Sequence, residues 1–202
     1  MKKMIAGTII VIALVMVFVA LRPRLARAEL LKEGQVAPAF STQMVQGDQV
    51  TPVSLTDLHG RTVILYFYPK DDTPGCTKEA CSFRDGFARF QAAGLVVLGC
   101  SIDSKESHEA FIKKYSIPFP LLLDPGKTIA TEYGAANGIP VLGLDRRITY
   151  VINPDGIIQK VYPKVDPSVH STEILADLKI PEHPVPPPAA AAPADAPSSE
   201  QN

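Results

Sequence analysis

The stretch "RTVILYFYPKDDTPGC", Arg61 to Cys76, joins a continuous apolar run to the signals of a helix start. The run is rich in β-branched and aromatic residues and does not alternate, which predicts a strand buried on both faces. Thr73 followed by Pro74 is typical of a helix N-terminus, with threonine as the cap and proline at the first helical position. The stretch therefore predicts a strand that runs into a helix, with Cys76 in the first helical turn.

The segments that follow repeat this order of strand and helix. Two further buried strands are predicted in "GLVVLGCSID" and "FPLLLD", with helices at residues 76–92, 107–115 and 128–133. A hairpin turning at 153–156, an amphipathic helix within 168–180 and an edge hairpin around residues 47–48 complete the pattern. We therefore expect an α/β fold, with a central mixed sheet, helices on both faces and an N-terminal β-hairpin extension.

The two ends of the chain differ from the middle. Residues 4–21 are eighteen uncharged, mostly apolar residues, which as a helix would span about 27 Å of a bilayer. Residues 1–28 are therefore predicted to be a membrane anchor or, because "ARA" at 26–28 has the form of a cleavage site, a signal peptide. Residues 181–202, rich in proline and alanine, predict a disordered tail, which leaves 33–180 as the folded domain. We expect this domain at the cell envelope, on the periplasmic side.

Charge and composition narrow the classes of function. Residues 1–28 hold five of the 20 basic residues and none of the 21 acidic ones, so the remainder carries a net charge of −6. An acidic body without a basic stripe argues against a nucleic-acid partner. The four histidines are scattered, and none stands at metal-ligand spacing from a cysteine, so no metal site is predicted.

Two of the three cysteines, Cys76 and Cys81, lie close together at the predicted helix start. The free N–H groups and the positive dipole end of a helix favour a thiolate at Cys76. A thiolate can attack the O–O bond of a peroxide and become a sulfenic acid. On an ideal helix the two Cα atoms would be about 8.7 Å apart, beyond the ~7 Å that a disulfide allows, so a bond between them requires the helix to unwind. The alternatives are two inert buried cysteines or, less well matched by this C-x4-C spacing, a C-x-x-C oxidoreductase.

The segment "PKDDTPGC", Pro69 to Cys76, resembles the P-x-x-x-T-x-x-C active-site signature of peroxiredoxins, an AhpC/TSA-type family. The continuation "TKEACSFRD" is similar to the peroxiredoxin Q, or bacterioferritin-comigratory-protein, branch, and the similarity extends from about residue 34 to residue 180. The resemblance implies a thioredoxin-like fold and the thiol-dependent reduction of hydrogen peroxide and organic hydroperoxides, without a cofactor.

The resemblance also implies roles for four residues around the signature. Cys76 matches the peroxidatic cysteine and Cys81 the resolving cysteine, which implies an intramolecular disulfide between them. Thr73 matches the threonine that engages the peroxide and the thiolate, and its simpler role is a helix cap. Pro69 matches the proline that shields the site, and its simpler role is to end the strand.

Three further residues complete the prediction. The family's arginine before a late strand aligns with "RITYVI", which selects Arg147 over Arg146, and a guanidinium there would hold the thiolate and polarise the peroxide. Glu79 matches a glutamate common in this branch and is interpreted as a favourable residue of the first helical turns, without a catalytic role. Cys100 is interpreted as a buried strand cysteine rather than a second resolving thiol.

The sequence thus predicts a monomeric peroxidase with a cysteine cycle, recycled by thioredoxin or a thioredoxin-like protein. One alternative is a membrane-tethered redox sensor or holdase-type module, which would not turn over peroxide steadily. A second is a thiol–disulfide oxidoreductase, which would reduce insulin without consuming peroxide.

Overall fold

The computed structural model describes residues 29–136 and 145–181. The predicted leader, residues 1–28, lies outside the described residues, as does the predicted tail apart from its first residue. Among the helices of the two described ranges, none combines the length and the apolar character that a membrane crossing requires.

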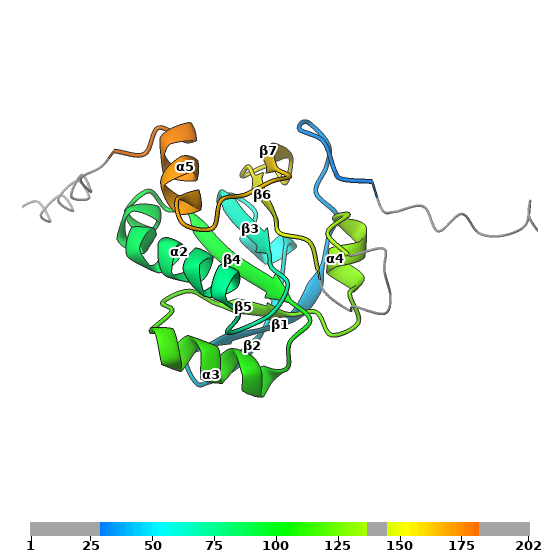
Figure 1. Cartoon of the computed structure of the whole chain (residues 1–202). Coiled ribbons are helices and arrows are strands. Elements are labelled where there is room, and N and C mark those ends of the chain that lie inside the picture. The colour runs from blue at the N-terminus through cyan, green and yellow to red at the C-terminus, as the bar shows by residue number, and fades with distance from the viewer. Residues whose placement is uncertain (1–28, 137–144, 182–202) are drawn as a thin grey trace, which may run out of the picture.

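A seven-stranded mixed sheet forms the centre of the fold, in the order β2-β1-β5-β4-β3-β6-β7 (Figure 1). Strand β3 pairs in parallel with β4, and β4 with β5, whereas the pairs β1–β2, β1–β5, β3–β6 and β6–β7 are antiparallel. The strands are β1 Ser41–Gln46, β2 Gln49–Ser54, β3 Val63–Phe67, β4 Val96–Ser101, β5 Leu121–Leu123, β6 Ile148–Ile152 and β7 Ile158–Tyr162. The predicted mixed sheet and its N-terminal hairpin, β1–β2, are confirmed.

Strand β3 is fully buried because it contributes to a separate hydrophobic core on each face of the sheet. Ile64 and Tyr66 point into one core, and the residues between and beside them point into the other. Side chains alternate between the faces of a strand, so an uninterrupted apolar run is the pattern that a strand covered on both sides requires. The run in the sequence is explained by these two cores.

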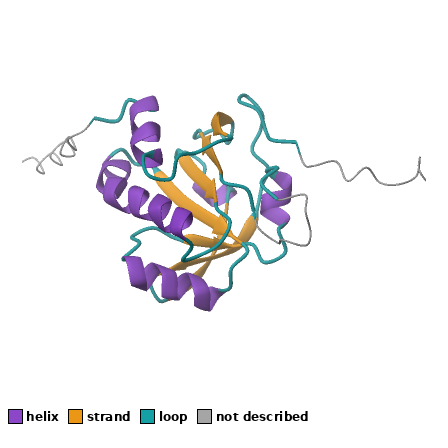
Figure 2. Ribbon diagram, viewed as in Figure 1, coloured by secondary structure: helices purple, strands orange, loops and turns teal. Residues whose placement is uncertain are grey.

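Helices cover both faces of the sheet, as predicted (Figure 2). Helices α2 Pro74–Ala92, α3 Lys105–Tyr115 and α5 His170–Asp177 contribute to the core that contains Tyr66. The short helix α4 Thr128–Glu132 packs on the opposite core, which is also contacted by Leu58 at the end of the 3₁₀ helix Thr56–Leu58. The site described below therefore lies on the face covered by α2, α3 and α5.

Local signals set the boundaries of these elements. The turn between β6 and β7 is closed by the Asn153 side chain, which accepts hydrogen bonds from the backbone N–H of Asp155 and Ile157 at 3.0 and 2.9 Å. Helix α3 begins two residues before the predicted Ser107, because Ser104 caps it by accepting a hydrogen bond from the Ser107 N–H.

Candidate active site

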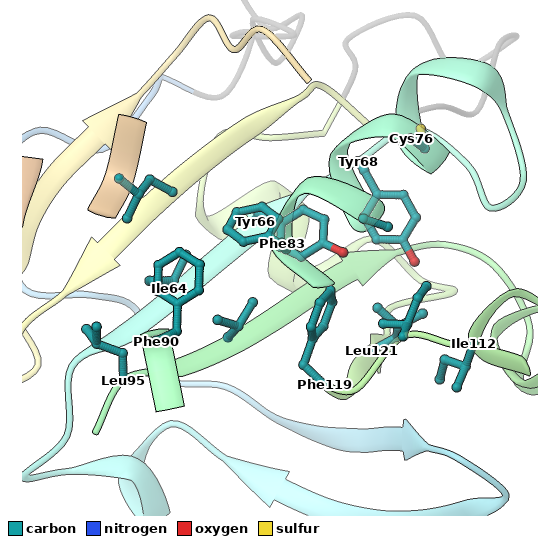
Figure 3. Close-up of a cluster of buried hydrophobic side chains, with 14 of the residues drawn as sticks. Ile64, Tyr66, Tyr68, Cys76, Phe83, Phe90, Leu95, Ile112, Phe119 and Leu121 are labelled. Carbon is teal, nitrogen blue, oxygen red and sulfur yellow. The ribbon is translucent and has the colours of Figure 1, made fainter. Parts of the chain in front are cut away.

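The site lies where β3 runs into α2. Cys76 is the third residue of α2 and is only 2% exposed. Figure 3 shows it at the edge of the hydrophobic cluster beneath α2, near Tyr68. The first bond into the helix runs from the Thr77 N–H to the Thr73 carbonyl, so the N–H groups of Gly75 and Cys76 precede the helical ladder. The sulfur therefore sits in the positive end of the helix dipole, as predicted.

Thr73 occupies the cap position, but the prediction that its side chain caps α2 is wrong. No hydrogen bond from the helix reaches that side chain. Its hydroxyl instead donates to the Lys70 carbonyl at 3.0 Å. The hydroxyl closes the loop before the helix, and its oxygen retains lone pairs for another donor. Pro69, which directly follows Tyr68 in this loop, is half-buried.

Arg147 is the cation that the structure brings to Cys76. One guanidinium nitrogen, Nη2, lies 3.3 Å from the Cys76 sulfur, and the other, Nη1, donates to Glu79. Gly75 leaves room for this approach, because a Cβ at that residue would lie 3.1 Å from Nη2 and the guanidinium would have to shift slightly. Arg146 points elsewhere, with its guanidinium 3.4 Å from the Gly134 carbonyl. The choice of Arg147 over Arg146 therefore agrees with the geometry.

Glu79 is a member of this site that the sequence interpretation undervalued. Its side chain is fully buried, and burial raises its pKa to about 7, although the Arg147 guanidinium opposes that rise. Of its two carboxylate oxygens, Oε2 accepts from Arg147, whereas Oε1 has no hydrogen-bond partner among the described residues. The spacing in the sequence indicates that Glu79 belongs to the site. Residues three apart on a helix share a face, and Glu79 is three residues after Cys76.

The burial of Glu79 predicts a specific pH dependence of stability. Its pKa is about 7 in the folded chain and 4.5 when unperturbed, so between these values the folded state binds more protons and stability falls as the pH rises. Urea unfolding of the reduced protein is measured at pH 5 and at pH 8. Between these two pH values, the free energy of unfolding of the native chain should fall by about 2 kcal/mol more than that of Glu79→Gln. Parallel losses in the two proteins would contradict the buried, protonatable carboxyl.

Cys81 lies on the same helix, and no break in α2 separates it from Cys76. It is half-buried, and all three cysteines are free thiols. Because α2 is continuous, the ideal-helix separation of about 8.7 Å between the two Cα atoms applies. A disulfide between them is therefore incompatible with this conformation.

Cys100 stands apart from the other two cysteines. It is fully buried in β4 and belongs to the core on the opposite face of the sheet from Cys76. Burial also raises the pKa of its thiol well above the usual range. The interpretation of Cys100 as a packing residue agrees with this placement.

We therefore expect Cys100→Ala to retain turnover within about twofold of the native rate. Its only expected effect is a loss of stability of roughly 1 kcal/mol, because one buried sulfur is removed. Thermal unfolding together with steady-state peroxide consumption measures both. A loss of turnover at unchanged stability would mean that Cys100 takes part in the chemistry.

Comparison with known sequences places these residues in a family. Residues 34–161 match the AhpC/TSA family. The chain is 44% identical over 153 residues to the putative peroxiredoxin bcp of Coxiella burnetii, a match that covers 73% of this chain and 99% of that protein. It is also 44% identical over 149 residues to the chloroplastic peroxiredoxin Q of Sedum lineare, covering 73% of this chain and 77% of the plant protein.

Solved structures agree with the sequence comparison. Peroxidoxin BcpB from Mycobacterium tuberculosis superimposes with a TM-score of 0.66 at 32% identity, covering 74% of this chain and 97% of that one. The bacterioferritin comigratory protein of Xanthomonas campestris gives a TM-score of 0.63 at 30% identity, covering 69% and 90%. The fold is thus the thioredoxin-like fold that the resemblance implied. Since the matched region includes both the helix that carries Cys76 and the strand that follows Arg147, the chain belongs to the AhpC/TSA family of peroxiredoxins.

Proposed function

We propose that Cys76 is the residue at which this thiol-dependent peroxidase reduces hydrogen peroxide and organic hydroperoxides. The observation that carries the proposal is the Arg147 guanidinium 3.3 Å from a sulfur held at the N-terminus of α2. A cation and free N–H groups at that point favour the thiolate, which is the nucleophilic form. The related Xanthomonas campestris protein has alkyl peroxide reduction activity, which supports the inclusion of organic hydroperoxides.

The first step is the attack of the Cys76 thiolate on one peroxide oxygen. A sulfur–oxygen bond forms, the O–O bond breaks, and the sulfur is oxidised to a sulfenic acid while the other oxygen leaves as alkoxide or hydroxide and takes up a proton. Arg147 stabilises the charge that develops on the leaving oxygen. The Thr73 hydroxyl oxygen, whose proton is engaged by the Lys70 carbonyl, can accept a hydrogen bond from the peroxide.

The second step joins Cys76 to Cys81. The Cys81 sulfur attacks the sulfenic sulfur, a disulfide forms, and the hydroxyl group leaves as water. The first turns of α2 have to unwind for this step, because the intact helix holds the two Cα atoms too far apart. An external dithiol protein, thioredoxin or a relative of it, then returns both cysteines to the thiol form.

Unwinding predicts a change in amide exchange upon oxidation. We expect the hydrogen-bonded N–H groups of residues 77–84 to exchange at least tenfold faster in the disulfide form than in the reduced form, while α5 is unchanged. Exchange measured by mass spectrometry on both forms tests this. Equal protection of residues 77–84 in the two forms would exclude a Cys76–Cys81 bond formed by local unfolding.

Steady-state consumption of peroxide with thioredoxin, thioredoxin reductase and NADPH tests the complete cycle. We expect continuous turnover. Consumption of one equivalent followed by arrest would favour a redox sensor, and reduction of insulin without peroxide consumption would favour a protein thiol–disulfide oxidoreductase.

We also propose that the domain is monomeric and is held at the cell envelope, on the periplasmic side, by residues 1–28. The support for the attachment is the uncharged apolar run at residues 4–21. The support for the monomer is that the described residues expose only two large hydrophobic side chains, Val36 and Val169. A reporter that is active in only one compartment, fused after Ile180, tests the location, and light scattering of the domain tests the monomer. Reporter activity confined to the cytoplasm would refute the periplasmic assignment.

A further inference from the structure

The loop before Cys76 is fixed by a buried aspartate that has no part in the two chemical steps described above. Asp71 is 6% exposed. Its Oδ1 accepts from the Tyr68 hydroxyl at 2.8 Å, and its Oδ2 accepts from the Ser107 hydroxyl at 2.8 Å. Its backbone N–H donates to Asp103 Oδ2 at 2.9 Å. The carboxylate therefore ties the loop both to the end of β3 and to the first turn of α3.

His108 completes this cluster and shares a proton with the aspartate. Its Nε2 lies 3.2 Å from the Leu122 carbonyl, which can only accept, so Nε2 carries a hydrogen. Its Nδ1 lies 2.8 Å from Asp71 Oδ2. Two lone pairs would repel at that distance, so a proton lies between the two atoms. A fully buried pair of this kind is costly to break, because the remaining partner is left without its counterpart.

The neighbouring Asp72 makes a second attachment to the same helix. Its Oδ1 lies 2.5 Å from the Tyr115 hydroxyl, and its Oδ2 lies 2.6 Å from the Lys114 ammonium. The backbone of Asp72 is left-handed, with φ 55°, a conformation that is uncommon for non-glycine residues but that aspartate tolerates better than most. His108 and Tyr115 are seven residues apart and so lie on one face of α3, which grips the loop at two points two turns apart.

We propose that α3 positions the peroxide-facing side of the site through Asp71, which acts as a positioning residue and not as a catalytic one. The proposal rests on the proposed function of Cys76. Lys70 directly precedes Asp71, and its carbonyl receives the Thr73 hydroxyl. Fixing Asp71 therefore fixes the orientation of the Thr73 side chain, and the Thr73 carbonyl in turn accepts the first hydrogen bond of α2.

The attachment to α3 is separate from the stabilisation of the thiolate. Arg147 reaches Cys76 from the residue before β6, and neither it nor Glu79 hydrogen-bonds to α3 within the described ranges. Loosening the loop should therefore impair the reaction with peroxide, which needs Thr73 in place. It should not slow the reaction of Cys76 with a simple alkylating agent, because that reaction depends on the ionised sulfur and on access to it, and does not need Thr73. A general loss of structure would change both reactions together.

The test compares Asp71→Asn with Glu109→Gln, a control on α3 whose carboxylate pairs with Lys105 at 2.7 Å and does not hydrogen-bond to the loop. In Asp71→Asn, the second-order rate of Cys76 oxidation by hydrogen peroxide should fall at least tenfold. The rate of Cys76 alkylation by iodoacetamide between pH 5 and pH 8 should not fall by more than twofold. Neither rate should change in Glu109→Gln. If Asp71→Asn does not fold, Ser107→Ala removes a single hydroxyl and should slow the peroxide reaction two- to fivefold.

Two outcomes would overturn the proposal. One is a folded Asp71→Asn protein whose peroxide rate stays within twofold of the native rate. The other is an equal fall of the peroxide and alkylation rates. Amide exchange at residues 71 and 77, whose N–H groups donate to Asp103 and to the Thr73 carbonyl, decides the attachment independently of the substrate. It should accelerate at least tenfold in Asp71→Asn while α5 keeps its protection. If the native chain did not react with peroxide, the proposed function would fail, and unchanged exchange in Asp71→Asn would separately refute the attachment.

Discussion

Replacing Cys76 with serine is expected to abolish peroxide reduction, because a serine hydroxyl at the end of α2 stays protonated and cannot attack the O–O bond at a useful rate. The loss should exceed a factor of 10³ in steady-state turnover. Stopped-flow mixing of the reduced protein with hydrogen peroxide measures the first step directly. Because serine is close in size to cysteine and the site is buried, the variant should fold with nearly native stability.

Replacing Cys81 should have a different effect, and this difference separates the two roles. Cys81→Ser should react with the first equivalent of peroxide at the native rate and then stop, leaving a sulfenic acid at Cys76. A reagent specific for sulfenic acids should label it. Full steady-state turnover in Cys81→Ser would mean that another thiol resolves Cys76, and full turnover in Cys76→Ser would refute the mechanism.

The second large effect is expected at Arg147. Arg147→Gln removes the only described cation that contacts the Cys76 sulfur, and the second-order rate with hydrogen peroxide should fall by about 10²–10³. Arg147→Lys should be impaired as well, because an ammonium cannot contact Glu79 and the sulfur through two planar donors. The matched control is Arg146→Gln. The native Arg146 side chain contacts the Gly134 carbonyl and not Cys76, so this variant should react with peroxide at nearly the native rate.

The loss of Arg147 also leaves Glu79 buried without its partner. The resulting loss of stability has to be separated from the effect on the peroxide rate. The double variant Arg147→Gln/Glu79→Gln removes both charges and should recover stability without recovering the peroxide rate. Recovery of the rate in the double variant would mean that Arg147 serves only to neutralise Glu79. A larger effect at Arg146 than at Arg147 would overturn the assignment.

Local features of this chain could be predicted from the sequence because their causes are local. The run at Val63–Phe67 is apolar at every position because both faces of β3 are covered, and Asn153 marks a turn that its own side chain closes. The position of Cys76 at a helix start follows from the dipeptide Thr73-Pro74, at which the helix begins. In each case the residues that carry the signal are neighbours in the chain.

Features that depend on distant residues were harder to predict. Arg147 is 71 residues from Cys76, and only the resemblance to a family distinguished it from its neighbour Arg146. Glu79 is 68 residues from its partner Arg147, so its burial and raised pKa were not visible in the sequence. The Asp71–His108 pair spans 37 residues, and no local pattern in the sequence indicates it.

Thr73 illustrates a different limit. Its residue type and position are those of a helix cap, and its backbone does begin α2. The side chain nevertheless bonds to the Lys70 carbonyl, because the loop brings that acceptor within reach. Residue preferences at helix ends describe which side chains can cap, but the choice between competing partners depends on the path of the preceding loop.

Peptide mapping after a single turnover tests the cysteine cycle most directly. The reduced protein is mixed with one equivalent of hydrogen peroxide, remaining thiols are blocked, and the peptides are identified by mass spectrometry. The account predicts that the peroxide is consumed, that Cys76 and Cys81 are joined within one chain, and that Cys100 is recovered as a blocked thiol. Recovery of Cys76 as a thiol after the peroxide has gone, or its linkage to Cys100, would contradict the account.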